Sequence, residues 1–251
     1  MIFNWTAFLA RLIALFLSTA GFALDGNQVL HTRPNNKSYQ RDPLYIQFVE
    51  TTFQNAIALG SDAEVLRYAS DHVTVDGLFV ELGTGKGRTT NFIAALNPHK
   101  ILYTFDSYLG HLADWDKGDK IMTKDFFAWP ENEKLPQFLL NVVLTKGWFA
   151  DTLSDFAKQQ EKPIAFLHVD CEIYESTSQA LIILGPKIAD GTVFLFDEFY
   201  NYPNFRNHEY KAFQEFLNDY GFKAEYLAYN ALHEQVAVRV KKVDLFSRDK
   251  S

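Results

Sequence analysis

Acidic residues gather at the ends of two apolar segments in the second half of the chain. They are Asp170 and Glu172 after the segment that begins at residue 163, and Asp197 and Glu198 after the segment that begins at residue 191. Continuous apolar runs are typical of buried parallel strands, whose carboxyl ends lie at one edge of a sheet. We therefore expect the four carboxylates to converge. Oxygen ligands at this density of negative charge favour Mg²⁺ or Mn²⁺, the alternative being that these acids are capping or solvated groups.

A glycine-rich turn follows an earlier apolar segment, in the sequence Glu81-Leu-Gly-Thr-Gly-Lys-Gly87. Closely spaced glycines let the backbone approach a ligand without obstruction by Cβ atoms. The turn is not a phosphate loop, because Lys86 is not followed by Ser or Thr, and it is not a dinucleotide fingerprint, because Arg88 holds the third glycine position. The remaining pattern is the form seen in S-adenosylmethionine binders; an ordinary tight turn is the alternative. The cofactor contacts predicted from the turn are Glu81, Gly83, Thr84, Gly85 and Gly87.

Asp106 ends the next apolar segment, 23 residues after Gly83. An acid at this place accepts hydrogen bonds from ribose hydroxyls in doubly wound nucleoside-binding folds, and Ser107 follows it directly. Trp148 and Phe149 come after another strand end and are candidates to stack on adenine, although aromatic side chains there are commonly part of the core. These features together predict a nucleoside cofactor.

Two residues are candidates to remove a proton from a substrate hydroxyl. They are Glu172 and His208, which lies shortly after the second acidic pair. His168 lies within an apolar segment and is interpreted as a core residue. Cys171 is the only cysteine, which excludes an intrachain disulfide and a cysteine zinc site.

The elements that must position these residues alternate between strands and helices. The strands expected are 77–83, 101–106, 141–146, 163–170, 191–197, 222–229 and 234–240. The helices expected are 43–58, 62–70, 88–96, 150–160, 175–189 and 208–220. This order predicts an α/β fold with a doubly wound, mostly parallel seven-stranded sheet, and the short turn before the last strand makes that strand antiparallel. An irregular region extends to about residue 137.

The composition indicates one globular catalytic domain. The chain has 251 residues, 47% of them apolar, with 23 Phe and a formal charge of −7. The absence of a Lys/Arg-rich run argues against a nucleic-acid backbone as partner and favours a small molecule. We expect a domain over 43–251 behind an extension over 1–42.

Within that extension, the apolar stretch 12–24 resembles a weak secretory signal. We favour an amphipathic or buried helix that stays on a cytoplasmic protein and could support a homodimer. The alternative is export or membrane association through residues 1–24.

The assembled segments resemble class I S-adenosylmethionine-dependent methyltransferases of the macrocin O-methyltransferase type. The resemblance rests on Phe105-Asp-Ser107, Gly147-Trp-Phe-Ala-Asp-Thr-Leu153, His168-Val-Asp-Cys-Glu-Ile-Tyr-Glu-Ser-Thr177 and Phe196-Asp-Glu-Phe199. It implies that the glycine turn and Asp106 hold the cofactor and that Glu172 is a candidate base. It also implies Mg²⁺ ligands at Asp170, Asp197 and Glu198, with Asp170 beside the cofactor as well. Two positions depart from the family: Glu172 replaces the usual Asp, and Asp197-Glu198-Phe199 replaces the common Asp-Asp-Tyr.

The first hypothesis is therefore metal-dependent methyl transfer to a hydroxyl of a sugar, a glycoside or another small polyol. A catechol-type O-methyltransferase is the second, with Tyr200 and Tyr202 as an aromatic slot for a planar phenol. A noncatalytic cofactor-binding protein of the same fold is the third. We expect the loops 108–136 and 200–207 to select the acceptor.

Overall fold

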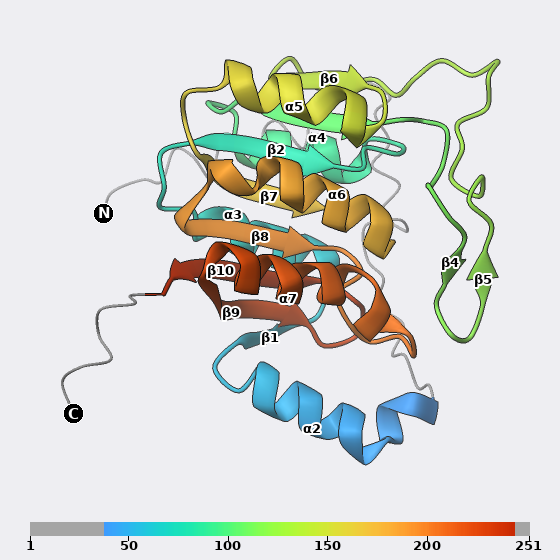
Figure 1. Cartoon of the computed structure of the whole chain (residues 1–251), viewed down its shortest axis with the longest axis vertical. Helices are drawn as coiled ribbons and strands as arrows, with labels where there is room; N and C mark the ends of the chain where they lie inside the picture. The colour runs from blue at the N-terminus through green and yellow to red at the C-terminus, as the bar shows by residue number, and fades with distance from the viewer. Residues whose placement is uncertain (1–37, 244–251) are drawn as a thin grey trace, which may run out of the picture.

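The structure is a computed structural model that describes residues 38–243 (Figure 1). Eight strands form one sheet in the order β1-β9-β10-β8-β7-β2-β3-β6. The strands are β1 (Ile57–Leu59), β2 (Leu78–Leu82), β3 (Leu102–Asp106), β6 (Val142–Lys146), β7 (Ile164–Val169), β8 (Ile188–Phe196), β9 (Phe222–Asn230) and β10 (Val236–Lys242). Only β10 runs antiparallel to its neighbours in this sheet, which confirms the predicted mostly parallel fold with an antiparallel last strand.

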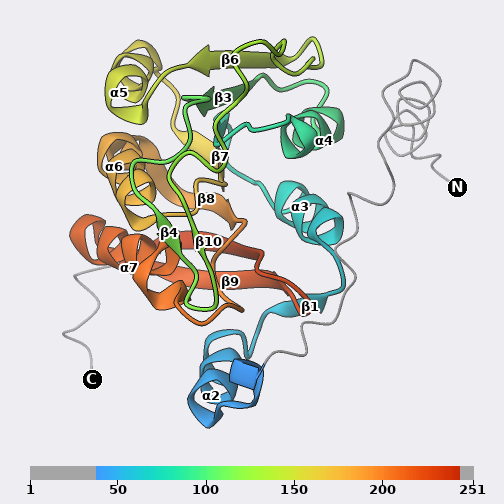
Figure 2. The ribbon, with the colours of Figure 1, turned by 90° about the vertical axis from the view of Figure 1, so that its right-hand side faces the viewer.

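Helices cover both faces of the sheet (Figure 2). α3 (Asp62–Asp71) and α4 (Arg88–Leu96) lie on one face, and α5 (Phe149–Gln159), α6 (Tyr174–Leu184) and α7 (Glu209–Tyr220) lie on the other. Alternate side chains of the central strands supply the two layers of the core: Val80 and Leu167 pack under α5 to α7, whereas Phe79 and Phe166 pack under α3 and α4. Every side chain of β7 is buried, as expected for a strand covered on both faces.

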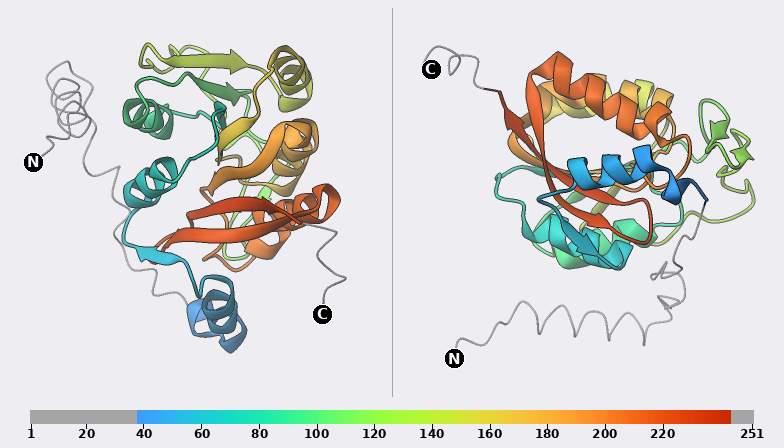
Figure 3. Two further views of the ribbon diagram at one scale, coloured as in Figure 1. Left: turned by 90° about the vertical axis from the view of Figure 1, so that its left-hand side faces the viewer. Right: turned by 90° about the horizontal axis from the view of Figure 1, so that it is seen from below.

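Two of the predicted helices end earlier than expected. The helix expected over 43–58 ends early: α2 (Pro43–Thr52) is followed by the eighth strand, β1, which pairs in parallel with β9. Phe53 stops the helix because its ring is buried against Tyr229 and Tyr200, which turns the chain toward the sheet edge (Figure 3). The helix expected over 175–189 ends at Leu184, before a 3₁₀ turn, η2 (Gly185–Lys187), and the start of β8.

The region expected to be irregular contains a small hairpin, β4 (Trp115–Asp116) with β5 (Ile121–Met122). Residues 107–137, which we call the arm, connect β3 to β6 and extend away from the carboxyl edge of the sheet (Figure 1). Lys117 anchors the hairpin: its Nζ lies 2.6 Å from Oε2 of Glu234 and 4.2 Å from the centre of the Trp115 ring. The η3 (Phe205–Asn207) and α7 region adds a second anchor, because His208 Nε2 lies 2.8 Å from the carbonyl oxygen of Asp116.

The signal-like stretch 12–24 lies outside the described residues. Among residues 38–243, no helix is both long and apolar enough to cross a membrane.

The carboxyl ends of β2 and β7 touch at Gly83. The amide of Asp170 donates to the carbonyl of Leu82 at 2.8 Å, and Gly83 has φ +91°. A Cβ atom on Gly83 would overlap the carbonyl oxygen of Asp170. Only glycine combines this conformation with this approach, so the glycine turn is held against the strand that carries the first acids of the cluster.

We expect Gly83→Ala to destabilise the protein by at least about 2 kcal/mol, because it adds backbone strain to a steric overlap. Gly85→Ala is the matched control: Gly85 also has a positive φ, but no atom lies within 4 Å of its Cβ position. The control should cost about 1 kcal/mol. Urea denaturation measures both, and equal losses would contradict the close approach at Gly83.

Candidate active site

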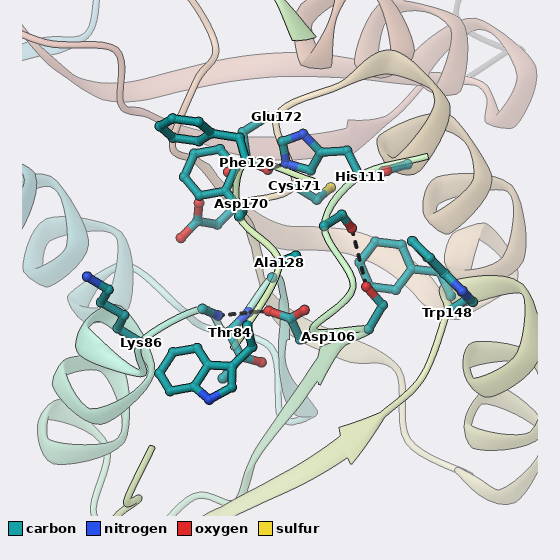
Figure 4. Close-up of a pocket in the computed structure, with 18 of the residues that line it drawn as sticks. Thr84, Lys86, Asp106, His111, Phe126, Ala128, Trp148, Asp170, Cys171 and Glu172 are labelled. Carbon is teal, nitrogen blue, oxygen red and sulfur yellow. Dashed lines mark hydrogen bonds and ion pairs between the residues drawn. The ribbon is translucent and has the colours of Figure 1, made fainter. Parts of the chain in front are cut away.

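A cavity of about 630 Å³ lies at the carboxyl edge of the sheet, under the arm (Figure 4). Its size is in the usual range for small-molecule sites. One wall is the glycine turn, a second is formed by the residues that follow β3 and β7, and the arm supplies the third. The arm residues that line it are Gly110, His111, Leu112, Phe126 to Pro130, and Glu133. Six predicted site residues also line it outside the turn: Asp106, Ser107, Trp148, Phe149, Asp170 and Glu172.

Asp106 organises the glycine turn. Its Oδ2 accepts hydrogen bonds from the amides of Thr84 at 2.9 Å and Gly85 at 2.8 Å, and its Oδ1 accepts one from the amide of Tyr108 at 2.7 Å (Figure 4). A carboxylate has about four acceptor positions, so roughly one remains for a ligand hydroxyl. Asp106 therefore shapes the turn and the start of the arm, and its predicted contact with a ribose stays a prediction.

Glu81 does not face the cavity, so its prediction as a cofactor contact is wrong. Its side chain is fully buried, and Oε2 accepts hydrogen bonds from the hydroxyls of Thr90 at 2.6 Å and Thr104 at 2.7 Å. His168, predicted as a core residue, lies with Nδ1 3.1 Å from Oε1 of Glu81. Alternation along β2 turns this carboxylate beneath the glycine turn, where it ties together α4, β3 and β7.

Gly87 is also absent from the cavity wall. It has φ +73° at the N-cap of α4, and its α-carbon faces the ring of Phe138. Gly87 therefore shapes the glycine turn and does not line the cavity.

Three carboxylates form a candidate metal centre: Asp170, Glu172 and Glu198 each bring an oxygen to within 4.8 Å of the others. Burial raises the pKa of each carboxyl group, and neighbouring acids raise those of Asp170 and Glu198 further, with Asp197 the largest such cause for both. Oε2 of Glu198 is buried without a hydrogen-bond partner. An unpaired oxygen beside several like charges fits a divalent cation bound by hard oxygen ligands.

Asp197 is at the edge of this group and is not one of the three. Its Oδ1 accepts a hydrogen bond from Nε2 of Gln235 at 3.1 Å, and its amide donates to the carbonyl of Val169 at 2.9 Å. The negative charge of Asp197 still contributes to the raised pKa values of Asp170 and Glu198.

Glu209 is a fifth carboxylate at this site, which sequence reasoning missed. Its side chain is fully buried; Oε2 accepts from the amide of Glu198 at 3.1 Å, and Oε1 has no hydrogen-bond partner. Burial, followed by the charges of Glu172 and Asp197, raises its pKa. In the sequence Glu209 is one of many acids in the first turn of a helix, where solvent exposure is usual, so no local signal marks it.

Glu172 and His111 form a pair on the cavity wall. His111 Nε2 lies 2.9 Å from Oε2 of Glu172, and both side chains are almost buried. Glu172 has φ +57°, a left-handed conformation that is uncommon for residues other than glycine. His111 was not identified from the sequence, because nothing in the sequence indicates which residue of the arm reaches the carboxylate cluster.

Two other predicted features do not reach the cavity. His208 does not line it, because its Nε2 lies 2.8 Å from the carbonyl oxygen of Asp116 in the hairpin, so this arrangement does not bring the predicted base to the cavity. Tyr200 and Tyr202 are buried in the core and do not form an aromatic slot: the Tyr202 hydroxyl donates to the carbonyl of Glu198 at 3.1 Å. The sequence shows tyrosines near the acidic pair but not the direction in which they point.

Comparisons with known proteins agree with this fold. Residues 80–199 match the family model described as a methyltransferase domain. The calicheamicin methyltransferase CalS11 is similar in structure, with a TM-score of 0.57, 19% sequence identity, and coverage of 80% of this chain and 87% of that chain. The O-methyltransferase NovP has a TM-score of 0.52 and 21% identity over 72% of this chain and 79% of that chain. No curated protein matches the sequence.

The family match begins in β2, contains the glycine turn, Asp106 and the cavity wall, and ends just after the second acidic pair. Residues 80–199, just under half of the chain, thus match a methyltransferase domain, and the chain has the fold of methyltransferases of known structure.

Proposed function

We propose that this protein is an S-adenosylmethionine-dependent methyltransferase that transfers the methyl group to a hydroxyl oxygen of a sugar, a glycoside or another small polyol, and that it requires a divalent cation. The observation that carries the proposal is the position of Asp170. This residue lines the cavity beside the glycine turn and also belongs to the carboxylate cluster. A cofactor on the turn and a cation on the cluster would therefore share one wall, as transfer between adjacent ligands requires.

The comparisons support the choice of acceptor atom. NovP is an O-methyltransferase, and a second CalS11 structure, with a TM-score of 0.51 and 19% identity, is described as a TDP-rhamnose 3'-O-methyltransferase. These proteins have the same fold as this chain, and Asp170 and Glu172 bring carboxylate oxygens of the acidic cluster to the cavity wall, which suits a hydroxyl acceptor.

Each part of the site has a role in this proposal. S-adenosylmethionine supplies an activated methyl group, and a bound Mg²⁺ or Mn²⁺ would lower the pKa of an acceptor hydroxyl. Asp106 and the turn amides orient the cofactor, with Trp148 and Phe149 beside it. Asp170 and Glu198 would hold the cation, with Asp197 adding negative charge at the edge of the cluster, and Glu172 accepts the hydroxyl proton.

The direct test is methyl transfer from radiolabelled S-adenosylmethionine to a panel of acceptors with Mg²⁺ or with EDTA. The panel contains methyl glycosides, free sugars, inositol and catechol. Transfer to a glycoside or polyol that EDTA abolishes supports the proposal. Transfer to catechol alone would instead favour a phenol acceptor, for which Phe126 and Phe127 on the cavity wall would provide the apolar surface.

We expect Asp106→Ala to weaken binding of S-adenosylhomocysteine about 10- to 100-fold, which corresponds to losing roughly 1.5 to 3 kcal/mol of charge-assisted hydrogen bonding. The loss has two sources, a ribose contact and the order of the turn amides. Isothermal titration calorimetry measures it. Asp125→Ala, an exposed acid on the arm, is the control. Equal affinity of Asp106→Ala and wild type would contradict the assignment.

We expect Glu198→Gln to lose binding of Mn²⁺ and nearly all methyl transfer while keeping its affinity for S-adenosylhomocysteine. Glu198 contributes an oxygen that has no hydrogen-bond partner among the described residues, and it does not line the cavity beside the glycine turn, where the cofactor is proposed to bind. Calorimetry with each ligand separates the two effects. Full activity of the variant in EDTA would show that the cluster does not act through a metal.

The buried acids also predict a pH dependence of stability in metal-free buffer. The folded-state pKa of Glu209 is raised above its unfolded value, so its contribution to stability is complete below about pH 4 and is lost as pH rises toward the folded pKa. Glu209→Gln cannot ionise. Relative to wild type, its urea midpoint should therefore rise more at pH 8 than at pH 5. An equal difference at both pH values would show that Glu209 ionises in the folded protein as easily as in water.

A further inference from the structure

We infer that His111 is a positioning residue for the proposed methyl transfer: it holds the carboxylate of Glu172 in its working orientation and makes that orientation depend on the arm lying over the cavity. The inference rests on the proposed function, in which Glu172 accepts the proton of the acceptor hydroxyl. It adds a residue from a segment of the chain that contributes no acid to the cluster.

The contact leaves one oxygen of Glu172 for chemistry. Oε2 lies 2.9 Å from Nε2 of His111, with the two side chains 11% and 8% exposed. Oε1 makes no hydrogen bond within residues 38–243, and Glu172 lines the cavity. An imidazole that donates to Oε2 therefore orients the carboxylate and leaves Oε1 to accept from a ligand.

The histidine ring is itself held in place by the arm. It packs against the ring of Phe127 at 5.1 Å between centroids and edge-on to Trp115 at 6.3 Å. The backbone amide of His111 donates to the carbonyl of Lys124 at 2.6 Å. Trp115 is also the ring under the Lys117 ammonium group that anchors the hairpin. The position of the imidazole is therefore set by the hairpin anchor.

Two features of Glu172 make a hydrogen-bond partner important. Its backbone is in the left-handed region, and neighbouring carboxylates repel its charge. Glu209 is held by an amide at the end of β8, and Asp197 by Gln235 beside β10, both within the sheet and its connections. The hydrogen bond of Glu172 comes from the arm. Within the described part of the chain, His111 is the one side chain in hydrogen-bond contact with the Glu172 carboxylate.

It follows that the acid cluster is complete only when the arm covers the cavity. If the arm moves away, Asp170, Asp197 and Glu198 keep their places on the sheet, whereas Glu172 loses its donor and is free to turn away from its neighbours' charge. Closure over an acceptor would thus assemble the proton-accepting group at the moment when the cavity is shielded from water.

The test compares His111→Ala with His111→Gln, whose side-chain amide keeps a donor at similar reach, and with His99→Ala, an exposed histidine, as the control. In methyl transfer, we expect His111→Ala to lower kcat about 10- to 100-fold, with the KM for S-adenosylmethionine changed less than about twofold. His111→Gln should restore most of kcat. A His111→Ala variant with wild-type kcat, or a change in KM alone, would overturn the inference.

Two measurements without an acceptor test the contact itself. Hydrogen exchange of the backbone amides in residues 107–127 should become faster in His111→Ala and in Glu172→Gln, with the melting temperature of the whole protein nearly unchanged, and His99→Ala should have no effect. The ¹⁵N shifts of the His111 ring should show Nε2 protonated in wild type and change in Glu172→Gln. Unchanged exchange and unchanged shifts would overturn the inference. If wild type methylates no acceptor in the panel while exchange and shifts respond as expected, the proposed function fails and the contact stands.

Discussion

Like charge concentrated at one edge of the sheet constrains the rest of this structure. Five carboxylates converge there from the ends of β7 and β8 and the start of α7: Asp170, Glu172, Asp197, Glu198 and Glu209. Burial raises the pKa of Asp170, Glu172, Glu198 and Glu209. Such a group costs free energy unless it is protonated, paired or bound to a cation. The fold supplies few cationic partners, and a site for a divalent cation is the simplest account of why the acids are kept together.

The sheet and the arm divide the work of building this site. The sheet positions the side of the cavity proposed for the cofactor. Gly83 brings the glycine turn against Asp170, and Asp106 accepts hydrogen bonds from the turn amides. The arm contributes the wall that faces the acceptor, through His111, Leu112 and the aromatic residues 126, 127 and 129. In the proposed function, a rigid cofactor site under a separately anchored arm would allow the acceptor to change while the sheet residues stay the same, a common arrangement for sites on α/β sheets.

The sequence predicted the strands and the cavity edge well because both depend on local signals: apolar runs for buried strands, and acids or glycines where the strands end. It was less successful with residues whose role depends on the direction in which their side chains point in the folded chain. Glu81 has the position of a cofactor contact in the sequence, yet strand alternation turns it into the core. Tyr200 and Tyr202 follow the acidic pair, yet they pack inward. His111 and Glu209 reach the cluster from a loop and a helix start, where neither periodicity nor spacing indicates which way a side chain points. The eighth strand, three residues long, was too short to show a pattern.

The central claim is that one cavity edge holds a nucleoside cofactor and a divalent cation side by side, with Asp170 between them. Crystals grown with S-adenosylhomocysteine and Mn²⁺ test it most directly, because manganese is located by its anomalous scattering. The account predicts one manganese peak in contact with the carboxylates of Asp170 and Glu198, and the ribose of S-adenosylhomocysteine next to Asp106. Manganese bound elsewhere, no manganese at all at a saturating concentration, or a cofactor bound away from the glycine turn would contradict it.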